Sequence, residues 1–379
     1  MRQDSEGSGA AVLVSVDFGE HDYSESLAEL CLLAETAGVR TLAVVEGKRQ
    51  QPDAALFAGS GKVQEIAEIV ERMEVPLVIF NHDLSPAQMR NLTARLNTHN
   101  SNVRVIDRTM LILDIFAQRA QSHEGKVQVE LAQLKYLATR LVGQGVGMGQ
   151  QKFAVGARGP GETKLELDRR KLDKRVHLLK ERLEKLKHQR AVQRRARGRA
   201  DVLSVSIVGY TNAGKSTLFN RLTRADAYVA DQLFATLDTT SRRMFSEGQG
   251  EVVVSDTVGF IRHLPHSLVA AFRSTLEETI QADLLLHVVD ANNANRDDQI
   301  AEVNKVLAEI GAADIPQVLV FNKIDLQDIP PSVQRDDYGK IARIFLSAKS
   351  GAGLDGLQLA LAEAKAARQS GAATKSTTQ

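Results

Sequence analysis

One segment of the chain has the composition and spacing of a phosphate-binding loop. An apolar run, residues 203–208, is followed by Gly209-Tyr210-Thr211-Asn212-Ala213-Gly214-Lys215-Ser216, and a helix-compatible segment begins at Thr217. The spacing G-x4-G-K-S/T between a strand and a helix lets backbone N–H groups point at phosphates. An accidental glycine-rich turn is the alternative, and the strand and helix on either side argue against it. The chain is therefore predicted to bind a nucleoside triphosphate.

Within and beyond this loop, three side chains are predicted to hold Mg²⁺. The Ser216 hydroxyl is one ligand, and Lys215 beside it would reach the β- and γ-phosphates. The strand at residues 251–255 ends in Asp256-Thr257-Val258-Gly259, which places Asp256 as the second ligand and the N–H of Gly259 near the γ-phosphate. Between them lies Phe234-Ala235-Thr236-Leu237-Asp238, in which Thr236 is the expected switch threonine. We expect Lys215, Thr236 and Gly259 to act in catalysis.

Two later segments predict the base. Asn322-Lys323-Ile324-Asp325 follows an apolar strand, residues 318–321. The Asp325 carboxylate can accept two hydrogen bonds from the edge of guanine, and a buried polar group left unpaired by adenine discriminates by about 10⁴ or more. The stem of Lys323 would cover the base, and Ser347-Ala348-Lys349 would add a backbone N–H. The nucleotide is predicted to be GTP or GDP, and this ordered set resembles the translation-factor-like branch of small P-loop GTPases.

Two positions bear on the rate of hydrolysis. Phe260 stands where many GTPases carry a glutamine that orients water, and a phenyl ring cannot do this. We therefore expect slow hydrolysis by the protein alone, with a partner or another group needed for speed. Asn212 stands where some related GTPases help to hold K⁺. A role in tying the phosphate loop to the switch segment is an equal alternative.

The whole chain is that of an ordinary globular protein of two or three domains. It has 379 residues, a net charge of +1, 43% hydrophobic and 25% charged residues. Its single cysteine, Cys31, lies among leucines, which favours packing and a reducing compartment. No apolar run approaches the length of a membrane span and the first residues lack a signal-peptide core, so we expect a cytoplasmic protein without stable membrane insertion.

Residues 11 to about 120 alternate apolar strands with helical segments. Strands are predicted at 11–16, 40–45, 77–80 and 103–106 and helices at 26–37, 62–73 and 86–96, which together form a four-stranded parallel sheet. Gly59-Ser60-Gly61-Lys62 resembles part of a phosphate loop. It is interpreted instead as a turn that caps a helix, because Leu56 replaces the first glycine and Val63 the hydroxyl.

An antiparallel helical hairpin follows. Apolar residues recur at spacings of four and three in two segments, as at the a and d positions of a coiled coil. These are Val127, Leu131, Leu134, Ala138 and Leu141, then Leu172, Val176, Leu179, Leu183 and Leu186. A glycine-rich loop, residues 143–161, is expected to join the two helices.

The hairpin is strongly basic. Residues 151–200 contain 17 Lys/Arg and 6 Asp/Glu, a net charge of +11. A solvated helix face is the usual explanation of such a run, but this concentration favours a phosphate-rich partner. RNA is favoured over DNA because neither a helix-turn-helix nor a zinc pattern is present. Aromatic residues make up only 4% of the chain, so phosphate and shape contacts should dominate over base stacking.

With these motifs in order, the chain is identified as a member of the HflX family of ribosome-associated GTPases. Residues 156–166, Gly-Ala-Arg-Gly-Pro-Gly-Glu-Thr-Lys-Leu-Glu, and Asp168-Arg169-Arg170 resemble the family signature. The nucleotide motifs and residues 104–109 and 114–120 match as well, so that the resemblance covers about 11–366. It implies binding to the large ribosomal subunit and its rRNA, GTP-dependent splitting or rescue of stalled ribosomes, and a hairpin loop near the peptidyl-transferase region. We expect this chain to lack the small C-terminal domain of many members.

The predicted architecture is a P-loop GTPase domain preceded by an N-terminal parallel α/β domain and an antiparallel helical hairpin. The boundaries are a flexible N-terminus at 1–10, the α/β domain at 11–120, the basic hairpin at 121–200, the GTPase domain at 201–366 and a disordered tail at 367–379. We expect a monomer. Two alternatives to a ribosome-dependent GTPase stay open: a nucleotide-gated binding module with little hydrolysis of its own, favoured by Phe260, and a general RNA-binding or assembly protein.

Overall fold

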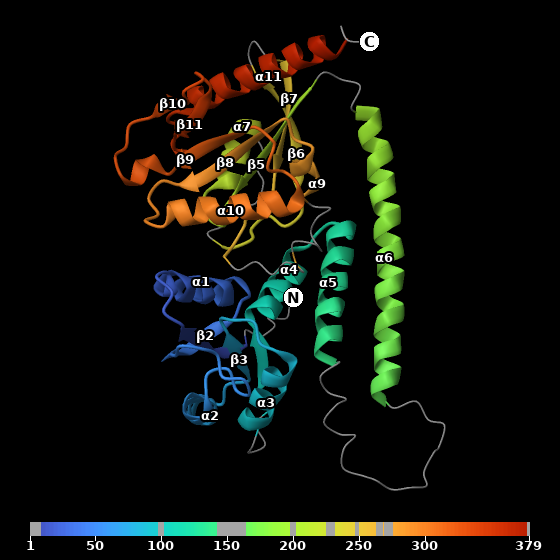
Figure 1. Cartoon of the computed structure of the whole chain (residues 1–379), viewed down its shortest axis with the longest axis vertical. Helices are drawn as coiled ribbons and strands as arrows, with labels where there is room; N and C mark the ends of the chain where they lie inside the picture. Colours follow the sequence, from blue (N-terminus) through green and yellow to red (C-terminus); the bar gives the residue numbers. More distant parts are fainter. Residues whose placement is uncertain are drawn as a thin grey trace, which may run out of the picture. The chain divides into compact units, whose positions relative to one another are not determined.

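The protein divides into two compact units, which are described separately. The computed structural model describes residues 9–97, 102–141, 164–197, 202–224, 232–246, 250–262, 268 and 276–376. The first unit consists of residues 1–118 and 126–184, and the second of residues 119–125 and 185–379. Figure 1 shows the elements of both units coloured along the sequence.

The first unit is built on a parallel sheet with the strand order β2-β1-β3-β4. These strands are β1 (Ala10–Asp17), β2 (Arg40–Lys48), β3 (Leu77–Phe80) and β4 (Arg104–Asp107). The helices are α1 (Tyr23–Thr36), α2 (Ser60–Met73), α3 (Pro86–Leu96) and α4 (Arg108–Arg119). Buried valines of β1 and β3 pack against the inner faces of α2 and α3. The predicted four-stranded parallel sheet is confirmed.

Local sequence signals explain where the helices of this unit begin. The Ser85 hydroxyl accepts a hydrogen bond from the N–H of Gln88, whose side chain accepts one from the N–H of Ser85. This reciprocal cap, with Pro86 in the first turn, starts α3 where the sequence predicts it. Gly59 precedes α2 at φ 87°, a conformation that side chains disfavour. A Cβ at Gly59 would lie 2.1 Å from a nitrogen of Arg49, so the Arg49 side chain occupies the space beside this turn.

The helical hairpin consists of α5 (His123–Leu141) and α6 (Lys164–Arg197). Two apolar residues from each helix are buried together, and Leu134 and Val176 pack against them. The buried residues are Val127, Leu131, Leu179 and Leu183. An ion pair between Arg175 and Glu130, 2.6 Å long, lies beside this seam. The predicted apolar seam is confirmed at these six of its ten positions. The predicted glycine-rich loop at 143–161 lies outside the described residues.

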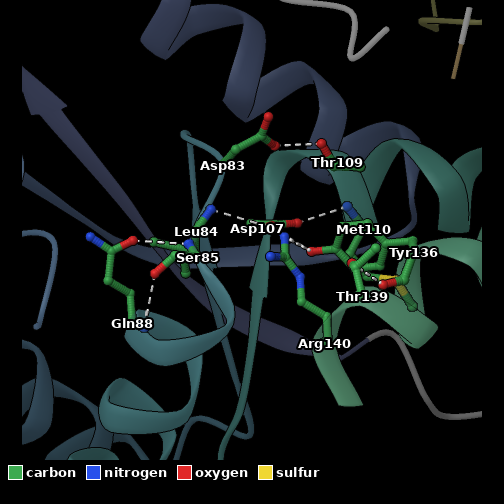
Figure 2. Close-up of polar contacts among 10 residues, drawn as sticks. All are labelled: Asp83, Leu84, Ser85, Gln88, Asp107, Thr109, Met110, Tyr136, Thr139 and Arg140. Atoms are coloured by element: carbon green, nitrogen blue, oxygen red, sulfur yellow. Dashed lines mark hydrogen bonds and ion pairs between the residues drawn. The ribbon is translucent and has the colours of Figure 1, made fainter. Parts of the chain in front are cut away.

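A buried carboxylate, Asp107, fastens α5 to the sheet of the first unit. Asp107 is the last residue of β4 and is fully buried. It accepts hydrogen bonds from the N–H groups of Leu84 (3.3 Å) and Met110 (2.9 Å). From α5, the Tyr136 hydroxyl donates at 2.5 Å and the Arg140 guanidinium at 2.8 Å (Figure 2). Burial raises the pKa of the Asp107 carboxyl, and these donors oppose the rise.

The second unit contains a mixed sheet with the strand order β10-β11-β9-β8-β5-β7-β6. Its strands are β5 (Leu203–Gly209), β6 (Thr240–Ser246), β7 (Gly250–Asp256), β8 (Leu284–Asp290), β9 (Gln317–Asn322), β10 (Ser332–Arg335) and β11 (Ile341–Phe345). Only β6 and β10, at the two edges, run antiparallel to their neighbours. Strand β5 pairs with β7 on one side and with β8 on the other, so the order of the strands reverses at β5. In sheets of this kind, ligands bind at the carboxyl end of such a strand.

Helices of the second unit include α7 (Lys215–Thr223), α9 (Glu277–Ile280), α10 (Arg296–Ile310), α11 (Leu354–Ser376) and a 3₁₀ turn, η1 (Ile324–Leu326). The prediction of a disordered tail from residue 367 is wrong as far as Ser376, because α11 continues to that residue. The preceding residues 360–367 are rich in alanine, which favours a helix that continues into the tail even without an apolar stripe. Within the described ranges, no helix has the length and apolar character needed to cross a membrane.

Candidate functional site

The phosphate loop joins β5 to α7 and is closely packed around its glycines. Gly209 has φ 145°, and a Cβ there would lie 2.2 Å from the carbonyl oxygen of Val288. A Cβ at Gly214 would lie 2.2 Å from the side-chain nitrogen of Asn322. Both glycines of the motif are therefore required by close approach of other atoms, not only by backbone freedom.

The lysine of the loop is buried. Lys215 is 6% exposed, and its ammonium donates a hydrogen bond of 2.7 Å to the carbonyl of Tyr210. Burial lowers the pKa of Lys215 to about 8, and the nearby Asp256 carboxylate opposes this fall. A triphosphate would supply the negative charge that such a buried cation needs.

Two backbone hydrogen bonds join the phosphate loop to the segment after β7. The N–H of Thr211 donates to the carbonyl of Phe260 at 2.7 Å, and the N–H of Phe260 donates to the carbonyl of Gly209 at 3.1 Å. Phe260 is 2% exposed, so its ring packs inside the protein. A Cβ at Gly259 would lie 2.8 Å from the Thr211 methyl and 2.9 Å from the Lys215 ammonium. Only glycine therefore fits where these two segments meet.

The three predicted metal ligands lie together. One oxygen of Asp256, Oδ2, accepts hydrogen bonds from the Ser216 hydroxyl at 2.7 Å and the Thr236 hydroxyl at 2.9 Å. The two hydroxyls are themselves 2.9 Å apart. The other oxygen, Oδ1, is buried and has no hydrogen-bond partner among the described residues. Burial raises the pKa of the Asp256 carboxyl, while Lys215 and the two hydroxyls lower it.

This oxygen set fits Mg²⁺. Mg²⁺ prefers oxygen ligands and keeps several waters, and an unpartnered buried carboxylate oxygen is a natural acceptor for such a water. Ser216, Thr236 and Asp256 would hold the ion, which would neutralise charge on the β- and γ-phosphate oxygens.

The predicted base-recognition segment is held in place by Asn322. Its side-chain NH₂ donates to the carbonyl of Ala213 at 2.9 Å, and its side-chain oxygen accepts from the N–H of Ala348 at 2.8 Å. Asn322 thus connects the phosphate loop with the 347–349 segment. Lys323, at φ 67°, forms a 2.8 Å ion pair with Asp290. Asp325 lines the same cavity as the phosphate loop, as predicted.

These segments enclose a cavity of about 460 Å³, which suits a small-molecule ligand. Most of the predicted nucleotide-binding residues line it: Thr211, Asn212, Gly214, Lys215, Ser216, Thr217, Phe234, Ala235, Thr236, Thr257, Gly259, Asn322, Lys323, Asp325, Ala348 and Lys349. Other predicted residues are absent from the lining: Gly209, Tyr210, Ala213, Leu237, Asp238, Asp256, Val258, Ile324 and Ser347. Tyr210 is buried, and its hydroxyl accepts a hydrogen bond from the N–H of Arg262. Gln232 and Leu326 also line the cavity and lie outside the motifs.

Asp238 makes a contact that the sequence motifs do not indicate. Its carboxylate accepts hydrogen bonds from the N–H groups of Gln121 and Ser122, both at 2.8 Å, and from the Ser122 hydroxyl. These partners belong to the 119–125 segment of the same unit, where α5 begins. Arg119, in that segment, also donates to the side-chain oxygen of Gln232. Segments 232–238 and 119–125 are therefore joined through side chains.

Comparison with known proteins decides the family. Three family models match consecutive parts of the chain: GTP-binding GTPase N-terminal at residues 24–117, GTP-binding GTPase middle region at 119–197 and 50S ribosome-binding GTPase at 204–323. The GTPase HflX of Escherichia coli strain K12 is 55% identical over 354 residues, which cover 93% of this chain and 82% of that protein. This chain belongs to the HflX family of GTPases.

Further relatives agree with this assignment. The GTPase HflX of Caldanaerobacter subterraneus subsp. tengcongensis is 48% identical over 347 residues, covering 92% of this chain and 78% of that protein. A crystal structure of SsGBP with GDP superimposes with a TM-score of 0.52 and 25% identity over 94% of this chain and 98% of the other. Membership of the HflX family shows that this chain is a GTP-binding GTPase.

Proposed function

We propose that this HflX-family GTPase binds GTP with Mg²⁺ in the cavity of the second unit, and that the GTP-bound form attaches to the large ribosomal subunit. Hydrolysis then accompanies the splitting or rescue of stalled ribosomes in the cytoplasm. The observation that carries the proposal is the convergence of Ser216, Thr236 and Asp256 beside the phosphate loop, because Thr236 belongs to the segment that senses the γ-phosphate.

The surface of α6 supports ribosomal RNA as the partner. Its described exposed side chains are mostly basic, and a concentration of positive charge attracts phosphates and makes affinity depend on salt. The exposed basic residues are Arg169, Arg170, Lys171, Lys174, Arg175, Lys180, Arg182 and Lys185, against Asp173, Glu181 and Glu184. The match of residues 204–323 to a 50S ribosome-binding GTPase model favours the large subunit.

Asn212 is the residue through which K⁺ would act. It lines the cavity and has φ 59°, a conformation that asparagine tolerates better than most residues. We propose that its side-chain oxygen helps to hold K⁺ beside the phosphates. Hydrolysis in KCl should then exceed hydrolysis in NaCl at equal ionic strength. Equal rates would favour the alternative, in which Asn212 ties the phosphate loop to the switch segment.

The partner and the surface are tested together by GTP turnover with and without large ribosomal subunits. Stimulation by subunits supports the proposal, and a triple variant, Lys174→Glu with Arg182→Glu and Lys185→Glu, should lose it. The matched control reverses charge in the second unit at Lys305→Glu, an exposed lysine of α10, and should keep the stimulation. Full stimulation of the triple variant would contradict binding through α6.

A second function, a nucleotide-gated binding module with little hydrolysis, is favoured by the buried Phe260. It differs from the first in one measurable respect. Ribosomal subunits would then bind the GTP form without raising turnover, whereas the leading proposal requires both effects.

A further inference from the structure

A GTPase without a glutamine after its switch glycine needs a partner or another group to orient the attacking water. Phe260 cannot serve, because its ring is buried and its backbone is held by Gly209 and Thr211. Within the protein, such a group must be a side chain that lines the cavity at the phosphate end and has hydrogen-bonding capacity to spare.

Most polar side chains at that end already have a defined task. Thr236 and Ser216 are bonded to Asp256. The Thr257 hydroxyl donates to the carbonyl of Ile207 at 2.7 Å and thereby supports the sheet. Gln232 accepts a hydrogen bond from Arg119.

Thr211 is different. It lines the cavity and is 7% exposed, and its hydroxyl oxygen is buried with no hydrogen-bond partner among the described residues. Its methyl group faces Gly259, since a Cβ at Gly259 would lie 2.8 Å from that methyl and 2.9 Å from the Lys215 ammonium. Thr211 thus lies beside the two groups expected to contact the γ-phosphate. An unpaired buried hydroxyl is unfavourable, so a ligand that pairs with it is favoured.

We propose that the Thr211 hydroxyl is a catalytic residue that orients the attacking water on the γ-phosphate, in the role left open by Phe260. Rotation about its χ1 angle exchanges the hydroxyl and methyl positions and brings the oxygen toward Gly259. The hydroxyl accepts a hydrogen bond from the water and donates one to a γ-phosphate oxygen. The water oxygen bonds to the γ-phosphorus, the bond from that phosphorus to the β–γ bridging oxygen breaks, and GDP leaves.

The protons balance without a base on the protein. Both protons of the water pass to inorganic phosphate or to solvent, and Thr211 gains and loses none. The Thr211 hydroxyl acts by positioning the reacting atoms. Its hydrogen bonds to the water and the γ-phosphate strengthen only as the transition state forms.

The test compares Thr211→Val, which keeps the shape and removes the hydroxyl, with Thr211→Ser, which restores it. We measure single-turnover GTP hydrolysis by the full chain, the affinity for GDP, and the affinity for GDP with aluminium fluoride as a transition-state analogue. The valine variant should hydrolyse GTP about 10- to 100-fold more slowly and bind the analogue correspondingly more weakly, with GDP affinity changed by less than about twofold. The serine variant should recover most of both losses.

Thr223→Val is the matched control, because the Thr223 hydroxyl bonds to the Phe219 carbonyl at the end of α7, outside the cavity. It should hydrolyse GTP at the wild-type rate. A Thr211→Val rate equal to wild type would overturn the proposal. So would a serine variant as slow as the valine variant, since the methyl group and not the hydroxyl would then matter. An equal loss of GDP affinity would assign Thr211 to ground-state binding and would also overturn it.

Discussion

In each unit of the protein, a parallel strand ends in a buried aspartate. The two aspartates differ in how many of their carboxylate oxygens accept hydrogen bonds from the described residues. Asp107 ends β4 in the first unit, and Asp256 ends β7 in the second. Burial raises the pKa of both carboxyls. Asp107 is bonded to two backbone N–H groups, a tyrosine and an arginine. Asp256 receives two hydroxyls on Oδ2, and its Oδ1 has no partner among the described residues.

This difference distinguishes a carboxylate whose two oxygens are both paired within the protein from one that could still accept a ligand. The protein supplies donors to both oxygens of Asp107, so the group holds α5 against the sheet and has little left to offer a ligand. Asp256 keeps one oxygen for a water or ion that the protein itself does not provide. Burial and a raised pKa alone do not distinguish the two sites, whereas the partners of each oxygen do.

The largest expected effect is on GTP hydrolysis and comes from removing the negative charge of Asp256. Asp256→Asn should slow GTP hydrolysis by at least about 100-fold, because the proposed Mg²⁺ site would lose the charge of its carboxylate. Thermal unfolding should change little, since the amide can still accept from Ser216 and Thr236. Single-turnover assays over a range of Mg²⁺ concentrations measure the first effect and calorimetry the second. Wild-type hydrolysis by this variant would remove Asp256 from the metal site.

At Asp107 we expect the opposite result, a loss of stability with little change in GTP binding. Asp107→Ala leaves Arg140 and two backbone N–H groups without their acceptor, which should cost about 3 kcal/mol of local stability. Hydrogen exchange of the amides in β4 and α5 measures this loss. GTP affinity should stay within about twofold of wild type. Tyr136→Phe, which removes a single donor, should show a smaller loss of stability. Equal losses for the two variants would contradict the conclusion that several donors together hold Asp107.

The smallest expected effect is a dependence of GTP affinity on pH, which arises from Lys215 in the second unit. Without nucleotide, burial lowers the pKa of Lys215 to about 8, and bound phosphates would raise it, so GTP binding takes up a proton above that pH. Affinity should be constant below pH 7.5 and fall about fivefold to tenfold between pH 7.5 and pH 9. Fluorescence titrations measure the change. Lys215→Arg should show a flat profile at any absolute affinity, because arginine stays charged.

Local motifs predict which residues gather around the cavity, because they fix backbone geometry. The spacing of Gly209, Gly214 and Ser216 requires one loop shape, and the strand ends at Asp256 and Asn322 follow from parallel topology. Contacts between distant segments are different. No motif relates Asp238 to Ser122, 116 residues away, or Tyr136 to Asp107. These pairs depend on how side chains meet after folding, which periodicity does not encode. The helical end of α11 was missed because weak apolar patterning outweighed alanine content in the prediction.

The central claim is that a γ-phosphate and Mg²⁺ at Asp256 control attachment of the basic helix to ribosomal RNA. Sedimentation of the full chain with large ribosomal subunits tests it most directly, with a non-hydrolysable GTP analogue, with GDP and with no nucleotide. Wild-type protein should sediment with subunits in the presence of the analogue and far less with GDP, and Asp256→Asn should lose this difference. Equal sedimentation of the wild-type protein in all three conditions would contradict it.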